Sequence, residues 1–290
     1  MTRVIQLTTP EHAHDHSVHV RGKAHGDLSV GRVDHSNSTT LNAVNSSKPF
    51  RSGLASARPR SVKPFADRGD AGRRLGVRLK DVLSHENVVV LGLPRGGVPV
   101  AREVARILRC PLDVLVVRKI GVPFQPELAM GAIGEESVLV VENDTVKICG
   151  VSDAEFERVV AVERAELDRR VRAYRHGRPP MSLENKVVVI VDDGLATGAT
   201  ANAACEIARA RGVTRVIVAA PVSSREAANR MDGVADQFVC LEAVGGPFAV
   251  GQWYDDFLPT SDQEVIDELD AARRDEIDGA SPKSTRRKRS

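Results

Sequence analysis

The sequence predicts an α/β fold in which helices flank a mostly parallel sheet, and three observations support this class. Short uninterrupted apolar runs alternate with amphipathic stretches over most of the 290 residues. Strands that are covered by helices on both faces have such continuous apolar runs. In strands with one solvent-exposed face, apolar and polar residues alternate. Glycines close two of the amphipathic stretches, as they do at helix ends. The hydrophobic content of 42 % is enough to bury a sizeable core.

The expected elements follow one another in the order that a parallel sheet requires. Strands are predicted at residues 88–93, 112–117, 187–191, 215–220 and 237–241. Helices are predicted at about 70–84, 98–109, 152–175, 199–211 and 262–274. The third helix opens with Ser152 and has Glu155 three positions on, which is a capping box. Residues 137–148 have apolar side chains on both sides of a polar run and predict a hairpin outside the parallel core.

We expect one domain over residues 63–275 between two disordered tails, 1–62 and 276–290. The first tail is poor in large apolar side chains and lacks periodicity. Four of its histidines, His12, His14, His16 and His19, could bind a divalent metal. A solvated tail is the favoured interpretation, because a metal site also needs supporting contacts. The second tail ends in a basic run that could bind acidic surfaces or nucleic acid. Solubility alone explains this run equally well.

Composition narrows the class of function. The 41 basic and 39 acidic residues nearly cancel, so no global field marks a binder of nucleic acid or membranes. The four cysteines form no C-x-x-C pair, which favours a reducing compartment over zinc or disulfide sites. No apolar run reaches the roughly 20 residues of a membrane helix, and no signal-peptide stretch opens the sequence. We therefore expect a cytoplasmic protein, with membranes and nucleic acid disfavoured as partners.

Residues 186–200 carry the strongest functional signal. A buried strand ends there in two carboxylates, Asp192 and Asp193, and then turns into a helix. Ligands of open α/β sheets bind at the carboxyl ends of strands. Adjacent carboxylates repel unless they accept hydrogen bonds or face a cation, and a ribose diol supplies two suitable hydroxyls. Backbone N–H groups, two hydroxyls and a helix N-terminus then form a candidate phosphate site at Ala196, Thr197, Gly198, Ala199 and Thr200.

Other interpretations of this segment are less consistent with its spacing. It has neither the Gly-Lys-Ser/Thr of a Walker loop nor the G-x-G-x-x-G of a dinucleotide fold. An ordinary strand followed by a capped helix, with Asp-Asp-Gly as a simple turn, is the remaining alternative. Two acids, a T-G-x-T sequence and a buried strand at functional spacing argue against that alternative.

The segment resembles the ribose-5-phosphate signature of type I phosphoribosyltransferases, in which an apolar strand leads into two acids and then T-G-x-T. The resemblance covers about residues 65–260 and is strongest to uncharacterised bacterial members. It implies the type I fold with a small hood, 5-phosphoribosyl 1-diphosphate as substrate, Mg²⁺ as cofactor and homodimers. It assigns Asp192 and Asp193 to the ribose hydroxyls and, mainly through the substrate, to Mg²⁺. It assigns residues 196–200 to the 5-phosphate.

Two further segments fall where this family would place them. Arg95, Gly96 and Gly97 follow the first core strand and resemble a diphosphate loop, with a plain glycine turn as the alternative. Arg118 and Lys119 follow the next strand and resemble the basic start of the catalytic loop of adenine phosphoribosyltransferases. The resemblance implies that these two cations neutralise the departing diphosphate. It also makes residues 124–136 a candidate lid.

The acceptor is less well defined by the sequence. Ala196 stands where hypoxanthine-guanine enzymes have a third acid, which argues against that substrate class. Trp253 and Tyr254 lie in an aromatic cluster that either stacks on a planar acceptor or packs under the last helix. Two functions stay open. One is transfer of the phosphoribosyl group to a nucleobase or other nitrogenous acceptor, and the other is a non-catalytic nucleotide sensor that binds nucleic acid through its basic tail.

Overall fold

The computed structural model describes residues 2–6, 65–83 and 87–280. The four clustered histidines and the basic run of the second tail lie outside these residues. The fold is α/β, as predicted, and its centre is a five-stranded sheet in the order β3-β2-β7-β8-β9. All four neighbouring pairs in this sheet are parallel. Its strands are β2 (Val88–Gly92), β3 (Leu112–Val114), β7 (Val187–Val191), β8 (Arg215–Ser224) and β9 (Gln237–Val244).

The strand order creates a switch point between β2 and β7. The chain passes from β2 to β3 on one side, and then returns to place β7 on the other side of β2. The loops that follow β2 and β7 therefore leave the same edge of the sheet next to each other. In doubly wound folds, this is the position where ligands bind.

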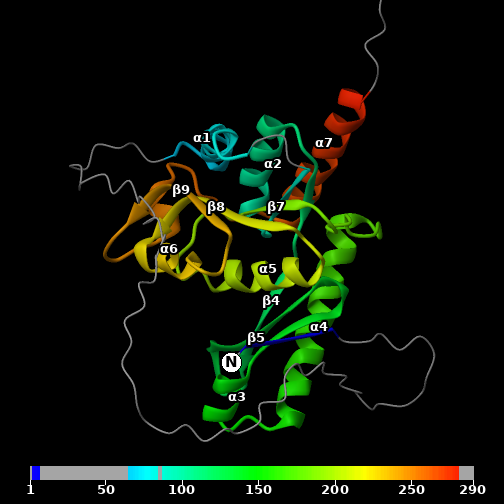
Figure 1. Cartoon of the computed structure of the whole chain (residues 1–290), viewed down its shortest axis with the longest axis vertical. Coiled ribbons are helices and arrows are strands. Elements are labelled where there is room, and N and C mark those ends of the chain that lie inside the picture. Colours follow the sequence, from blue (N-terminus) through cyan, green and yellow to red (C-terminus); the bar gives the residue numbers. More distant parts are fainter. Residues whose placement is uncertain (1, 7–64, 84–86, 281–290) are drawn as a thin grey trace, which may run out of the picture. The chain divides into compact units, whose positions relative to one another are not determined.

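Helices cover both faces of the parallel sheet (Figure 1). The helices α1 (Arg68–Lys80), α2 (Gly97–Leu108) and α7 (Asp262–Ala280) pack into one core, and α5 (Ala199–Ala210) and α6 (Arg225–Met231) pack into the other. Strand residues alternate between these cores, so that Val90 and Val189 face the first while Val89 and Ile190 face the second. Burial on both faces explains why these strands have uninterrupted apolar runs.

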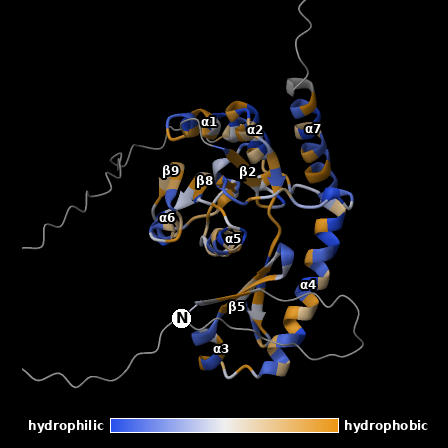
Figure 2. Ribbon diagram, turned by 45° about the vertical axis from the view of Figure 1, so that its right-hand side comes forward, coloured by the Kyte–Doolittle hydropathy of each residue, from blue (hydrophilic) through white to orange (hydrophobic). Residues whose placement is uncertain are grey.

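A second sheet is antiparallel and has the order β1-β6-β5-β4. Its strands are β1 (Thr2–Gln6), β4 (Val117–Val122), β5 (Gln125–Gly134) and β6 (Val138–Glu142). The long helix α4 (Asp153–Arg175) packs on β4 and β5, and α5 packs on the same two strands and on β6. Figure 2 shows α4 alternating between hydrophobic and hydrophilic colours along its length, as an amphipathic helix does. The capping box at Ser152 and Glu155 is confirmed.

The structure corrects several sequence-based expectations. The apolar run 112–117 is divided between two sheets. Leu115 N–H still donates to the Gly92 oxygen of β2, but Val116 N–H donates to the Glu135 carboxylate and Val117 pairs with Gly134 of β5. The second arm of the expected hairpin is the helix α3 (Asn143–Ile148). Most of the candidate lid 124–136 is β5, followed by the short helix η1 (Glu135–Ser137). Residues 2–6 and 276–280, which were expected to be disordered, lie in β1 and α7.

A buried ion cluster links the two sheets. Arg175, at the end of α4, is 1 % exposed and donates to the Asp113 carboxylate of β3 at 3.1 and 3.2 Å. Its guanidinium also donates to the Glu135 carboxylate and to the backbone oxygen of Val114. These bonds fix the segment where the chain leaves the parallel sheet and enters β4. Within the described ranges, no helix is both long and apolar enough to span a membrane.

Candidate functional site

Asp192 and Asp193 directly follow β7, at the switch point of the parallel sheet. The Asp192 N–H donates to Ala219 of β8, and the Asp192 carboxylate accepts the Asp193 N–H at 2.9 Å. Burial, and then the nearby charge of Asp193, raise the pKa of Asp192 to about 8. Burial also raises the pKa of Asp193, although the guanidinium of Arg68 opposes this effect. The acid pair is therefore held in an environment that disfavours two adjacent negative charges.

The loop after β2 lies against both acids. A Cβ atom at Gly96 would overlap the Asp193 carboxylate, and a Cβ at Gly97 would lie 2.6 Å from the backbone oxygen of Val191 and 2.9 Å from the Asp192 Cα. Glycine is required at both positions because the two loops approach so closely. Arg95 is exposed at the same turn. The structure thus brings together the acids and the residues that the sequence suggested for a diphosphate.

We expect Gly97→Ala to destabilise the protein by about 2 kcal/mol, because the added methyl group must push apart the two loops at the edge of the sheet. The midpoint of urea unfolding measures this change. Gly245→Ala is a suitable control, since a Cβ there would meet only the flexible Arg225 side chain, at 3.4 Å. Equal stability of the Gly97 variant and the wild type would contradict the close packing.

The N-terminus of α5 forms the third part of the site. Gly198 begins the helix with a φ of 72°, in the left-handed region that favours glycine. Ala196, Thr197, Ala199 and Thr200 are exposed there, at the positive end of the helix. Ser224 braces this loop, since its hydroxyl donates to the Ala196 oxygen at 2.6 Å. An exposed helix N-terminus that is held by such a contact is suited to bind an anion.

Arg68 is a site residue that the sequence interpretation missed. Its Nε and Nη2 atoms lie 2.9 and 2.8 Å from the same oxygen, Oδ2 of Asp193. Arg68 lies in the first turn of α1, 125 positions before Asp193. In the sequence it resembles an ordinary solvent-exposed arginine of a helix. The only local sign is Asp67, which caps the helix by accepting the Asp70 N–H and so fixes where the helix begins.

Two segments from opposite ends of the domain pair with each other beside Asp193. Residues 65–66 form backbone hydrogen bonds with residues 253–256, and we call this pairing the clasp. Tyr254 in the clasp is 6 % exposed and donates its hydroxyl hydrogen bond to the backbone oxygen of Asp193 at 2.6 Å. Its ring packs against Phe65 and Phe257. Tyr254 therefore positions Asp193 in this structure, whereas Trp253, at the end of the short helix η2 (Val250–Trp253), is partly exposed.

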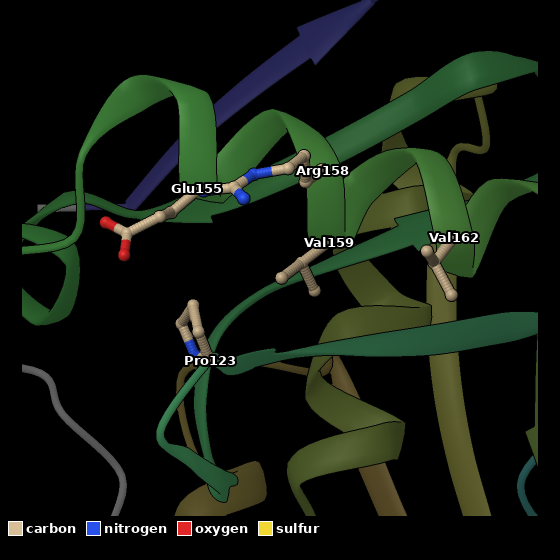
Figure 3. A pocket seen from close by; sticks show the side chains of 5 residues that line it. All are labelled: Pro123, Glu155, Arg158, Val159 and Val162. Atoms are coloured by element: carbon tan, nitrogen blue, oxygen red, sulfur yellow. The ribbon is translucent and has the colours of Figure 1, made fainter.

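Arg118 and Lys119 are engaged elsewhere in the described structure. Arg118 in β4 pairs with Glu163 of α4 at 2.6 Å, and Lys119 pairs with Glu127 at 3.3 Å. Both line a cavity of about 400 Å³ between the β4–β5 hairpin and α4. An adjoining cavity of about 390 Å³ shares Pro123 and Val159 with it (Figure 3). Neither cavity is lined by the acid pair.

The donor set at the switch point fits a magnesium ion that is bound together with a phosphorylated ligand. Mg²⁺ commonly takes one or two carboxylates from the protein, keeps several waters and takes its other ligands from substrate phosphates. Asp192 and Asp193 offer two carboxylates beside the loop of Gly96 and Gly97. Among the described residues, no group of three histidine, cysteine or acidic side chains is placed to hold a metal.

An acid pair and an exposed helix N-terminus at the switch point of a doubly wound sheet are features that suit a sugar phosphate. Residues 68–252 match the model of the phosphoribosyl transferase domain family. The chain belongs to this family.

Similar proteins are consistent with this assignment. Two proteins from strains of Mycobacterium tuberculosis, named "Putative phosphoribosyl transferase MT0597" and "Putative phosphoribosyl transferase Rv0571c", are each 54 % identical over 214 residues, which are 74 % of this chain and 48 % of theirs. The chain thus spans about half the length of the curated relatives it matches. The crystal structure of TT1426 from Thermus thermophilus is 42 % identical, with a TM-score of 0.65, and covers 71 % of this chain and 97 % of its own.

Proposed function

We propose that the protein transfers the phosphoribosyl group of 5-phosphoribosyl 1-diphosphate to a nitrogenous acceptor and releases diphosphate. The observation that carries this proposal is the contact between the two loops at the switch point. Gly96 and Gly97 pack directly against Asp193 and Asp192. A ligand that spans these loops and the start of α5 would need a diphosphate, a ribose diol and a terminal phosphate, in a connected arrangement.

In this proposal each part of the site has a separate role. Asp192 and Asp193 accept hydrogen bonds from the two ribose hydroxyls and hold the ring still. Residues 196–200 bind the 5-phosphate through the N-terminus of α5. Arg95, Gly96 and Gly97 bind the diphosphate. Displacement of diphosphate passes through an oxocarbenium-like state, so binding that fixes the ribose and stabilises the leaving group accelerates the reaction.

Mg²⁺ would be held by Asp192, Asp193 and the oxygens of the substrate. When bound, the ion supplies charge neutralisation on the diphosphate. The protein's own contribution is to keep the two carboxylates adjacent. Tyr254 supports this by fixing the backbone of Asp193 through its hydroxyl.

Arg118 and Lys119 are proposed to neutralise the departing diphosphate after a movement of the β4–β5 hairpin. This role requires Arg118 to release Glu163, which now lies 2.6 Å from it. Trp253 is the proposed contact for a planar acceptor, because Tyr254 is already buried between Phe65 and Phe257. The homodimer implied by the resemblance and the cytoplasmic location expected from the composition stay predictions.

The first test is a calorimetric titration of the protein with 5-phosphoribosyl 1-diphosphate and Mg²⁺, followed by a screen for diphosphate release over nucleobases and related amines. We expect saturable binding, and release that depends on one class of acceptor. Binding without release for any acceptor would favour the non-catalytic sensor instead. No binding would contradict both functions.

A further inference from the structure

Arg68 is paired with Asp193, one of the two acids that the proposed function assigns to the ribose hydroxyls. Its guanidinium donates to Asp193 Oδ2 through Nε and pairs with the same oxygen through Nη2, at 2.9 and 2.8 Å. Its Nη1 donates to the backbone oxygen of Leu258 at 2.8 Å. The guanidinium carbon also lies 4.0 Å from the centre of the Phe257 ring. Arg68 is therefore held on three sides, and its side chain is only 12 % exposed.

The same guanidinium borders the loop assigned to the diphosphate. A Cβ atom at Gly96 would lie 3.2 Å from Arg68 Nε, so the Gly96 backbone is a direct neighbour of the cation. The contacts given above use three of the five N–H donors of the guanidinium. Arg68 can thus reach ligand groups on either side, the ribose hydroxyls at Asp193 or the phosphate oxygens at Gly96.

The Asp193 carboxylate and the diphosphate of the proposed substrate, the two possible partners of Arg68, differ in charge. In the structure the cation faces one carboxylate, whereas a diphosphate would offer several negative oxygens in a geometry that guanidinium binds in a bidentate manner. Exchange of Asp193 for the diphosphate would free Oδ2 of Asp193 to accept a ribose hydroxyl.

We infer that Arg68 is a substrate-positioning residue that leaves Asp193 for the diphosphate when 5-phosphoribosyl 1-diphosphate binds. This inference rests on the proposed function. It gives the site a means of discrimination. Ribose 5-phosphate has the same diol and terminal phosphate but no diphosphate, so it must displace Arg68 from Asp193 without offering a new partner. The complete substrate displaces Arg68 and binds it again.

The test compares the affinities of 5-phosphoribosyl 1-diphosphate with Mg²⁺ and of ribose 5-phosphate, measured by calorimetry, for the wild type and Arg68→Met. We expect the variant to bind the diphosphate at least about tenfold more weakly, the loss of one or two charge-assisted hydrogen bonds. We expect its affinity for ribose 5-phosphate to stay equal or to increase. The ratio of the two affinities therefore falls at least about tenfold.

Arg74→Met is the matched control. Arg74 lies on the same helix, its guanidinium lies 4.4 Å from the Phe65 ring centre, and it pairs with Asp70 rather than with an acid of the site. This variant should keep the wild-type ratio. Thermal unfolding of both variants shows whether they stay folded. Phe257→Leu, which keeps the guanidinium but removes its stack, provides a second variant if Arg68→Met is unstable. We expect Phe257→Leu to lower the ratio in the same direction.

An equal loss of affinity for both ligands in Arg68→Met, or an unchanged ratio, would overturn the inference and leave the proposed function standing. Failure of the wild type to bind 5-phosphoribosyl 1-diphosphate would overturn both. The two failures are therefore distinguishable in one set of titrations.

Discussion

Asp192→Asn is expected to weaken the binding of 5-phosphoribosyl 1-diphosphate about 100-fold while making the folded protein more stable at pH 8. The loss of binding is expected because, in the proposed function, Asp192 ionises when it accepts the ribose hydroxyl and the cation bound with the substrate, and Asn cannot ionise. The gain in stability follows from the local environment. Burial and the charge of Asp193 raise the pKa of Asp192 to about 8, so the folded protein disfavours its ionised form.

The direction of the pH effect can be stated from this shift. Between the ordinary pKa of an aspartate, about 4, and the raised value in the folded state, the folded protein holds a proton that the unfolded chain has released. The stability of the wild type therefore falls as the pH rises through this window. Asn carries no charge, so the variant lacks this dependence. We expect the variant to exceed the wild type by roughly 1–3 kcal/mol at pH 8 and by little at pH 4.

Urea unfolding at both pH values and calorimetric titration measure the two effects. Asp232→Asn is the control, because Asp232 is exposed at the end of α6 and should change neither the stability nor the affinity. A stability difference between Asp192→Asn and the wild type that is the same at pH 4 and pH 8 would contradict the buried charge. Unchanged affinity in both Asp192→Asn and Asp193→Asn would contradict the ribose assignment.

Arg175→Met is expected to destabilise the protein by about 3–5 kcal/mol, the largest effect on folding that the structure indicates. The variant would leave the carboxylates of Asp113 and Glu135 buried without their cation. Both acids would keep backbone donors, from Val114 and Met181 for Asp113 and from Val116 for Glu135, but backbone donors do not cancel two negative charges. The charge repulsion acts where the two sheets join.

Thermal and urea unfolding measure this change, and we expect the melting temperature to fall by about 10 °C. Arg172→Met is the matched control, since Arg172 lies on the same helix and is exposed. Its stability should differ from that of the wild type by less than about 0.5 kcal/mol. A similar result for both arginines would show that the buried cluster contributes no more than a surface charge.

The parallel sheet and the acid loop could be predicted from sequence because their signals are local. The strand, the two acids and the start of α5 are contiguous, and burial on both faces gives β7 an apolar side chain at every position. The run 112–117 was misinterpreted for the same reason, because an unbroken apolar run cannot show that β3 and β4 belong to different sheets. Val146 and Ile148 gave the alternating pattern of a strand, but they lie in the short helix α3, where Ile148 is 85 % exposed.

Other features depend on contacts between distant segments. Gly134 lies in the candidate lid, but a Cβ there would meet the Ile207 side chain of α5 at 2.5 Å, so this glycine serves close packing. Arg68 and Asp193 are 125 positions apart, and no periodicity in either segment relates them. The fold brings them together only when α1 and the end of β7 are both in place.

The clasp has a consequence for how the protein can be shortened. Residues 68–252, which match the family, contain every strand of the parallel sheet. They exclude residues 65–66 at one end and 253–256 at the other, the two halves of the clasp. A truncated protein that follows the family boundaries would retain the acids and the phosphate loop, but it would lose Tyr254 and the backbone pairing beside Arg68. The smallest unit that keeps the contacts around Asp193 is therefore longer, at both ends, than the segment by which the family is recognised.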